Sequence, residues 1–241
     1  MMLKRLAFWS LMPFVLPQAL WVRKNAPRFA GASGRPEGST GSGPAVSLLA
    51  IGDSIIAGVG ASTYARALVG ATAQALATTL GTTVKWRAVG QIGATSEKVH
   101  KRLLTRLKET TYQYIIVSAG VNDITSLKRT AQWRTNLTTL LDALLEKYPD
   151  ATLGIAGIPP LHGFPLLPSP LRHVIGLRAR TFDAIIQQEA AKRPRVVHLA
   201  LDFDPSPERF SADGYHPSEV SHGEFGVAMA AALLGHETVR A

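Results

Sequence analysis

The sequence contains no cysteine among its 241 residues. This absence excludes a disulfide-stabilised scaffold, a zinc site built from thiolates and a cysteine nucleophile, and it leaves the cellular compartment open. Acidic residues are also scarce, with 17 Asp and Glu against 26 Lys and Arg, which gives a formal net charge of +9. Such an excess is found in proteins that bind nucleic acid or anionic membranes, so its distribution along the chain matters.

More than half of the basic excess lies in the first segment of the chain, where six basic residues meet a single acid, Glu37. The remainder is only mildly basic and has no basic run interleaved with aromatic residues, so nucleic acid is not expected as a partner. The six basic residues are Lys4, Arg5, Arg23, Lys24, Arg28 and Arg35.

An apolar stretch over residues 6–22 has a basic pair on either side, an order typical of a secretory signal. The small residues at 30–32 resemble a cleavage site, but the cations Arg23, Lys24 and Arg28 that precede them fit such a site poorly. The apolar stretch over residues 6–22 is also short for a membrane span. Two further interpretations are membrane association through residues 6–22 as an uncleaved surface anchor, and an amphipathic arm lying on the folded domain. An exported or membrane-associated location is favoured over a cytoplasmic one.

Residues 31–44 are rich in Gly, Ser and Pro and predict a flexible linker. We therefore expect an anchor-like arm and linker over residues 1–44, followed by one folded domain over residues 45–241. The length of this part and an apolar content of 46% suffice for a single core. The sequence leaves the oligomeric state open.

From residue 45 onward, short runs rich in Val, Leu and Ile alternate with segments of helical period. This alternation predicts an α/β fold with three layers, in which a five-stranded parallel sheet has helices on both faces. Right-handed crossovers place every strand-to-helix loop at one edge of such a sheet, where ligands bind. Strands are expected over 46–51, 84–89, 114–119, 152–158 and 196–201, and helices over 64–80, 96–107, 130–147, 171–192 and 218–234, the last two with breaks near glycines.

Two polar segments at this edge contain the residue types of nucleophilic catalysis. Gly52-Asp53-Ser54 ends the first strand, and it is either a simple turn or the position of a serine nucleophile. Asp213-x-x-His216 lies in the last loop. A serine hydroxyl needs a base to take its proton and a carboxylate to orient that base, and this short segment can supply both. The alternative is that His216, which precedes a proline, is an ordinary surface residue.

Two other acid and histidine pairs, Glu97/His100 and Glu219/His222, fall in predicted helices at a spacing that puts both side chains on one face. Two such pairs are typical of a di-iron helical bundle, but the strand pattern contradicts that architecture. Solvated ion pairs are the preferred interpretation, and no metal site is expected.

An acyl-transfer site also needs neutral donors directed at the oxyanion. The side-chain amide of Asn122, the backbone N–H of Gly93 before a helix start and the N–H of Ser54 are candidates. The glycine could instead serve turn geometry alone. A dinucleotide fingerprint, a phosphate-binding loop and a Gly-x-Ser-x-Gly elbow are all missing from the sequence.

Gly52-Asp53-Ser54, Gly93, Gly120-x-Asn122-Asp123 and Asp213-x-x-His216-Pro217 resemble, in order and in strand context, the four blocks of the SGNH (GDSL-type) hydrolase family. The resemblance implies a flavodoxin-like fold and ester hydrolysis without metal or cofactor. It implies Ser54 as nucleophile, His216 as general base and acid, and Asp213 as orienting acid. It also implies an oxyanion hole of Ser54 N–H, Gly93 N–H and Asn122. Ala88 departs from the pattern, since many members have Asn there.

Chain length and motif style resemble the small bacterial, lysophospholipase-like esterases of this family. The apolar loop 159–168 predicts a substrate wall, and we assign substrate binding to Ile55, Leu161 and Phe164, although a packed surface loop is the alternative. The expected partner is a small-molecule ester with a short or medium acyl chain. Alternatives are a lysophospholipase or thioesterase, a carbohydrate acetylesterase, or a non-catalytic membrane-tethered binding module. Asp53 is expected to shape its turn through hydrogen bonds to backbone N–H groups.

Overall fold

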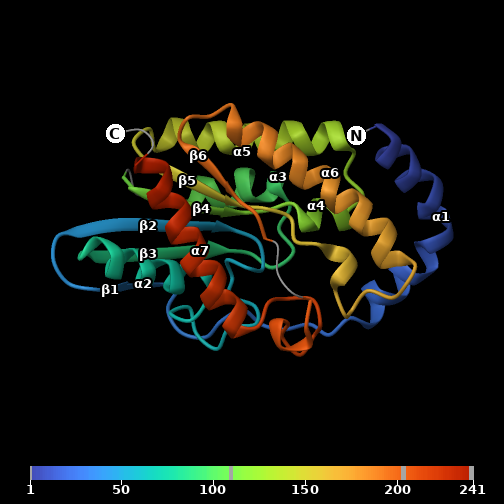
Figure 1. The fold of residues 1–241 in the computed structure, drawn as a ribbon, viewed down its shortest axis with the longest axis horizontal. Coiled ribbons are helices and arrows are strands. Elements are labelled where there is room, and N and C mark those ends of the chain that lie inside the picture. The colour runs from blue at the N-terminus through green and yellow to red at the C-terminus, as the bar shows by residue number, and fades with distance from the viewer. Residues whose placement is uncertain (1, 109–110, 202–204, 239–241) are drawn as a thin grey trace.

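Six strands form one sheet at the centre of the computed structural model, which describes residues 2–108, 111–201 and 205–238 (Figure 1). The strand order is β1-β3-β2-β4-β5-β6. All neighbouring strands are parallel except β1, which pairs antiparallel with β3. The strands are β1 (Glu37–Thr40), β2 (Ala45–Gly52), β3 (Thr83–Gly90), β4 (Tyr114–Ser118), β5 (Thr152–Ala156) and β6 (Val196–Leu199).

Helices cover both faces of the sheet and complete a three-layer α/β/α fold (Figure 1). Alternate residues of β2 enter two different cores, as the period of a strand requires. Leu49 and Ile51 face the core beneath α5 (Thr130–Lys147) and α6 (Leu171–Ala191). Leu48 and Ala50 face the core beneath α2 (Leu68–Leu80) and α7 (Glu219–Thr238). The predicted fold class is confirmed.

The sixth strand, β1, lies within the segment that the sequence analysis assigns to a flexible linker. Its residues are mostly exposed, so it has no apolar pattern that could reveal it. Gly38 explains how the edge strand fits, because a Cβ atom there would lie 2.5 Å from the Trp86 ring. The unstructured-linker expectation is wrong for residues 37–40, whereas a domain boundary near residue 44 stays a prediction.

Glycines do not interrupt the last two long helices. α6 continues through Gly176, and α7 continues through Gly223 and Gly226. A Cβ atom at Gly226 would lie 2.4 Å from the Cβ atom of Ala71, so this glycine lets α7 approach α2 closely. The expected breaks are therefore wrong, because both helices are continuous at these glycines.

Two other predicted helices differ in their limits or form. The helix expected from residue 64 begins at Leu68 as α2, after a turn. The helix expected over 96–107 is three consecutive short elements. They are α3 (Ser96–Lys98), a π-helix (Val99–Leu103) and a 3-10 turn (Leu104–Arg106). Thr95 caps α3, because its side chain accepts a hydrogen bond from the Lys98 N–H.

The N-terminal residues form α1 (Met2–Asn25), which lies beside α6 (Figure 1). One face of α1 is buried in the larger core through Phe8, Met12 and Val15. The Gln18 side chain donates to the carbonyl of Ser169 and accepts from the N–H of Leu171, so it fixes the start of α6. Within the described ranges, every helix is either too short or too polar to cross a membrane.

Candidate active site

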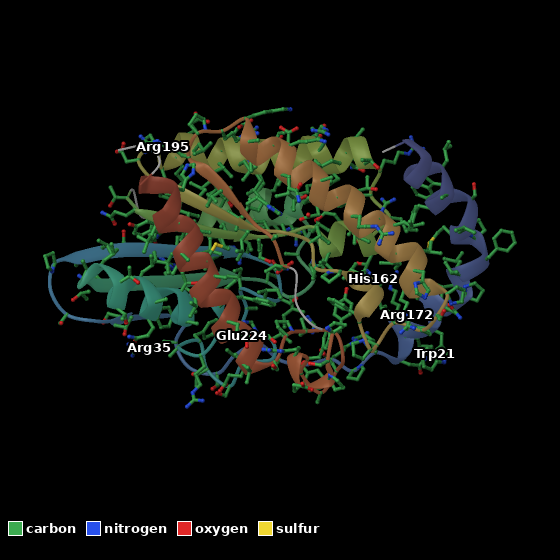
Figure 2. All side chains as sticks on the ribbon, in the orientation of Figure 1. Trp21, Arg35, His162, Arg172, Arg195 and Glu224 are labelled. Atoms are coloured by element: carbon green, nitrogen blue, oxygen red, sulfur yellow. The ribbon has the colours of Figure 1, made fainter. Side chains whose placement is uncertain are left out.

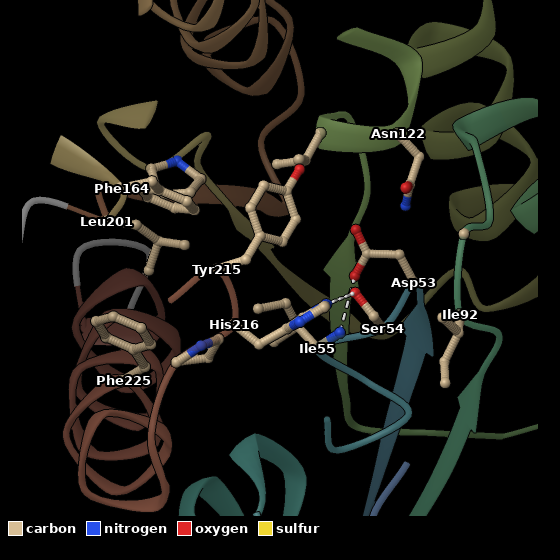
Figure 3. A pocket seen from close by; sticks show the side chains of 14 residues that line it. Asp53, Ser54, Ile55, Ile92, Asn122, Phe164, Leu201, Tyr215, His216 and Phe225 are labelled. Carbon is tan, nitrogen blue, oxygen red and sulfur yellow. Dashed lines mark hydrogen bonds between the residues drawn. The ribbon is translucent and has the colours of Figure 1, made fainter. Parts of the chain in front are cut away.

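Ser54 lies directly after the carboxyl end of β2, where the chain turns sharply (Figure 3). The turn is held against the neighbouring strand because the N–H of Asp53 donates to the carbonyl of Ser118 over 3.1 Å. Gly52 permits this close approach, since a Cβ atom there would lie 2.2 Å from the same carbonyl oxygen. The hydroxyl of Ser54 consequently faces a cavity at the edge of the sheet.

His216 and Asp213 meet Ser54 in one hydrogen-bonded chain. The Nε2 atom of His216 lies 2.9 Å from the Ser54 Oγ atom, and its Nδ1 atom lies 2.6 Å from an oxygen of Asp213. Because the carboxylate can only accept, Nδ1 carries the proton and Nε2 is left to accept from the serine hydroxyl. This is the geometry in which a serine can lose its proton to a base.

Asp213 is held as a carboxylate by the loop around it. Its Oδ1 atom accepts from the Ser211 hydroxyl and from the backbone N–H groups of Tyr215 and His216. Burial alone would raise the pKa of Asp213, but the hydrogen bonds from His216, Tyr215 and Ser211 outweigh it and lower the pKa to about 2. Asp213 therefore stays ionised beside His216 at neutral pH.

Asp53, unlike Asp213, is not hydrogen-bonded to His216 among the described contacts. Its Oδ1 atom accepts from the N–H of Ile55 over 3.1 Å, as expected for a turn-shaping side chain, and from the Ser118 hydroxyl over 2.9 Å. The carboxyl group is almost fully buried, and burial raises its pKa to about 6.

Three hydrogen-bond donors belong to residues that line the cavity at Ser54. Within the described part of the chain, the N–H groups of Ser54 and Gly93 have no hydrogen-bond partner. Gly93 has a φ of +74°, which favours glycine. The Asn122 side-chain amide donates one hydrogen to the carbonyl of Ala94 over 3.0 Å, which leaves its second hydrogen for the cavity that it lines.

The segment after β4 explains how Asn122 is positioned. Gly120 adopts a φ of +129°, and a Cβ atom there would lie 2.5 Å from the side chain of Ile158. The short helix α4 (Val121–Thr125) follows at once, which the sequence analysis missed. Asp123 is fully buried and accepts from the N–H and the hydroxyl of Ser96 over 2.9 and 2.8 Å. It thereby ties this segment to the one that contains Gly93.

The cavity has a volume of about 170 Å³ and is mostly apolar around its polar centre (Figure 3). Ile55 and Phe164 line it, but Leu161 does not; Leu161 is fully buried in the core, so its assignment to substrate binding is wrong. Pro159, from the loop predicted to form a substrate wall, also lines the cavity. Sequence reasoning missed the lining residues that reach the cavity from the other loops, from α4 and from α7, which are Ile92, Val121, Leu201, Tyr215, Pro217 and Phe225.

The two helical acid and histidine pairs do not form as pairs. Glu97 binds Lys101 and Lys128 instead, at 2.9 and 3.2 Å. Glu219 accepts from the N–H and the hydroxyl of Ser62 and pairs with Arg66.

His222 is fully buried, so the expected solvated ion pair is wrong there. Its Nδ1 atom accepts from the N–H of Leu68, and its Nε2 atom lies 2.9 Å from the carbonyl of Val59. Burial lowers the pKa of His222, which keeps the ring neutral. Among the described residues, no three His, Asp or Glu side chains are grouped so that they could hold a metal ion.

Most of the chain, including the site, matches a known protein family. The model of the GDSL-like lipase/acylhydrolase family matches residues 50–223. No curated protein sequence matches the chain.

Several solved structures share the fold. A family 3 carbohydrate esterase from Clostridium thermocellum has a TM-score of 0.61 at 19% identity, covering 82% of this chain and 100% of that one. A structure described as TesA has a TM-score of 0.59 at 22% identity, covering 79% and 99%. Est24, a carbohydrate acetylesterase from Sinorhizobium meliloti, has a TM-score of 0.55 at 16% identity, covering 79% and 99%.

Proposed function

The chain belongs to the GDSL-like lipase/acylhydrolase family and is an ester hydrolase, and on that premise we propose that it is a serine esterase acting through an acyl-enzyme on short to medium acyl esters. The observation that carries the proposal is the continuous hydrogen-bonded chain from Ser54 through His216 to Asp213. We assign these three residues the roles of nucleophile, general base and acid, and orienting carboxylate.

In the first step, the Ser54 oxygen attacks the ester carbonyl carbon while its proton passes to Nε2 of His216. The carbonyl π electrons move to oxygen, and the resulting oxyanion accepts hydrogen bonds from the N–H groups of Ser54 and Gly93 and from the Asn122 amide. Collapse of this intermediate breaks the bond to the alcohol oxygen, which leaves with the proton from His216. Asp213 stabilises the imidazolium that exists between these two transfers.

In the second step, water enters the place of the departed alcohol. His216 removes a proton from it, and the hydroxide oxygen attacks the acyl carbon on Ser54. A second oxyanion forms in the same set of donors and collapses. The serine oxygen leaves with the proton from His216, and the carboxylic acid is released.

The lining of the cavity supports an apolar acyl group. Phe164, Leu201 and Phe225 lie on one side of the serine, and Ile92 lies on the other (Figure 3). A cavity of about 170 Å³ has room for a small acyl group, which favours short chains over long ones. Acetyl esters of carbohydrates are the second candidate, because the chain shares its fold with carbohydrate esterases and an acetyl group would fit the same space.

Labelling with a fluorophosphonate tests the proposal without knowledge of the natural substrate, since the reagent requires an activated serine. We expect labelling of the wild type and none of Ser54→Ala. Ser39→Ala is a matched control, because Ser39 is exposed on the edge strand β1. Equal labelling of wild type and Ser54→Ala, or no labelling of either, would contradict the proposal, and the latter would favour a non-catalytic binding module.

Hydrolysis of a series of p-nitrophenyl esters then defines the acyl preference. We expect the highest kcat/KM for acetate to hexanoate and a steep fall for longer chains. Activity confined to acetylated sugars would favour the second candidate.

A further inference from the structure

The helix α1 is apolar on its outer side as well as on the side that packs on the domain. Phe8, Met12, Val15 and Val22 repeat on one face and are buried. The opposite side presents large apolar side chains to solvent, and Phe14 is 81% exposed and Trp21 62% exposed. We call the set Leu6, Phe14, Leu20 and Trp21 the outer face of α1; all four are more than half exposed. Apolar faces of this kind usually have a partner.

The chain segments that form and flank this face contain cations and no acids. Residues 1–36 and 151–182, which include α1, the loop before α6 and the first half of α6, contain no Asp or Glu. Among the described residues, none of Arg23, Lys24, Arg28, Arg172 and Arg180 forms an ion pair with an acid. Elsewhere on the molecule many cations form ion pairs with acidic side chains, including Arg66, Lys101, Lys128, Arg134 and Arg193.

A groove between α1 and α6 continues the outer face toward these cations. Leu11, Phe14 and Leu177 line its apolar part, and His173 and Arg180 lie in its wall. Trp21 and Arg172 lie at the same end of the molecule (Figure 2). Apolar side chains and unpaired cations therefore lie side by side in this groove and at the Trp21 end of the helix.

We propose that the outer face of α1 docks onto an anionic phospholipid surface, with the helix lying in the plane of the membrane. Apolar side chains would enter the boundary between headgroups and acyl chains, and the unpaired cations would meet lipid phosphates. Tryptophan suits that boundary because its ring is apolar and its N–H is polar. The acid-free surface favours a lipid layer over a second copy of this chain, because two copies would bring like charges together.

Flotation of the full chain with lipid vesicles at low ionic strength tests this proposal. The vesicles contain phosphatidylglycerol and phosphatidylcholine in equal parts, or phosphatidylcholine alone. We expect the wild type to float with the anionic vesicles and to bind the neutral ones at least tenfold more weakly. The double variant Phe14→Glu/Trp21→Glu should bind the anionic vesicles at least tenfold more weakly than the wild type.

Val220→Glu/Val227→Glu is the matched control, because these two valines of α7 are 62% and 60% exposed and the double substitution adds the same charge away from α1. It should float like the wild type, and thermal unfolding checks that each variant is folded. Failure of the wild type to bind anionic vesicles, or equal binding by the double variant, would overturn the proposal. So would a wild-type dimer in solution that the double variant converts to a monomer, because a second copy would then cover the face. None of these measurements uses ester hydrolysis, so the result is independent of the proposed function.

Discussion

The Nε2 atom of His216 lies 2.9 Å from the Oγ atom of Ser54, although 162 residues separate the two in sequence. Ser54 follows the end of β2, and His216 belongs to the loop before α7. The contact exists because a parallel sheet collects the loops after its strands at one edge. His216 can act as a base toward Ser54 only if its Nδ1 atom holds the proton, and Asp213 holds it there.

Asp213→Asn should lower kcat for p-nitrophenyl butyrate by about 10³-fold to 10⁴-fold. Asparagine can keep its oxygen toward the N–H groups of Tyr215 and His216, so the loop should stay folded. Its amide would then donate to Nδ1 of His216, which forces the proton onto Nε2 and blocks acceptance from the serine. Asp150→Asn serves as control, since the Asp150 side chain is 96% exposed. A loss of less than tenfold would remove Asp213 from the proposed role.

Asn122→Ala should lower kcat by about 10²-fold to 10³-fold and change KM little, because its amide is proposed to bind an oxyanion that forms only after attack. The variant also loses the hydrogen bond to the carbonyl of Ala94, so thermal unfolding must accompany the kinetics. If kcat stays within a factor of three and KM rises instead, Asn122 binds the ground state and has no part in the oxyanion hole.

Phe164→Ala should shift the acyl preference toward longer chains. The Phe164 ring lies against Tyr215 and Phe210, at 5.4 and 5.1 Å between ring centroids, and it lines the cavity. Its removal opens space beside the serine, so we expect the ratio of kcat/KM for octanoate to that for butyrate to rise about tenfold. Phe29→Ala provides the comparison, because Phe29 is exposed at 40% and outside the cavity lining. An unchanged ratio would place the acyl chain on another wall.

Asp53→Asn should remove a pH dependence of stability. The folded protein holds the Asp53 proton more tightly than the unfolded chain, because burial raises the pKa from 3.8 to about 6. This stabilisation is complete below pH 3.8 and is lost as the pH rises through 6. Between pH 4 and pH 7 the wild type should therefore lose up to about 3 kcal/mol relative to the variant. Urea unfolding of both proteins at pH 4, 5.5 and 7 measures the difference, and a constant difference would contradict the predicted titration.

Most of the parallel strands were predictable because they are short apolar runs, and β2 ends its run at the turn residue Gly52, whereas β3 shows the alternation of apolar and polar residues typical of a strand. The polar groups of the site were predictable for a related reason. Ser54, Asn122 and His216 each follow shortly after a recognisable sheet element or precede a helix, and the chemistry of acyl transfer requires those residue types.

Features that depend on distant packing were not predictable. β1 is an exposed edge strand whose pairing depends on the space above Trp86. Leu161 has the apolar character of a substrate wall, but the fold turns it into the core. The sequence pattern of His222 suggests a surface pair with Glu219. His222 is buried because Val59 and Leu68, which are distant in sequence, bind its ring in the folded domain.

His222 has a consequence for the time at which a reactive serine first exists. Its ring joins α7 to the carbonyl of Val59 and the N–H of Leu68, which lie just beyond Ser54 on the chain. A ribosome synthesises Ser54 well before residues 216 and 222, and a domain folds as a unit. A nascent chain therefore displays only an ordinary hydroxyl until α7 packs against the turn.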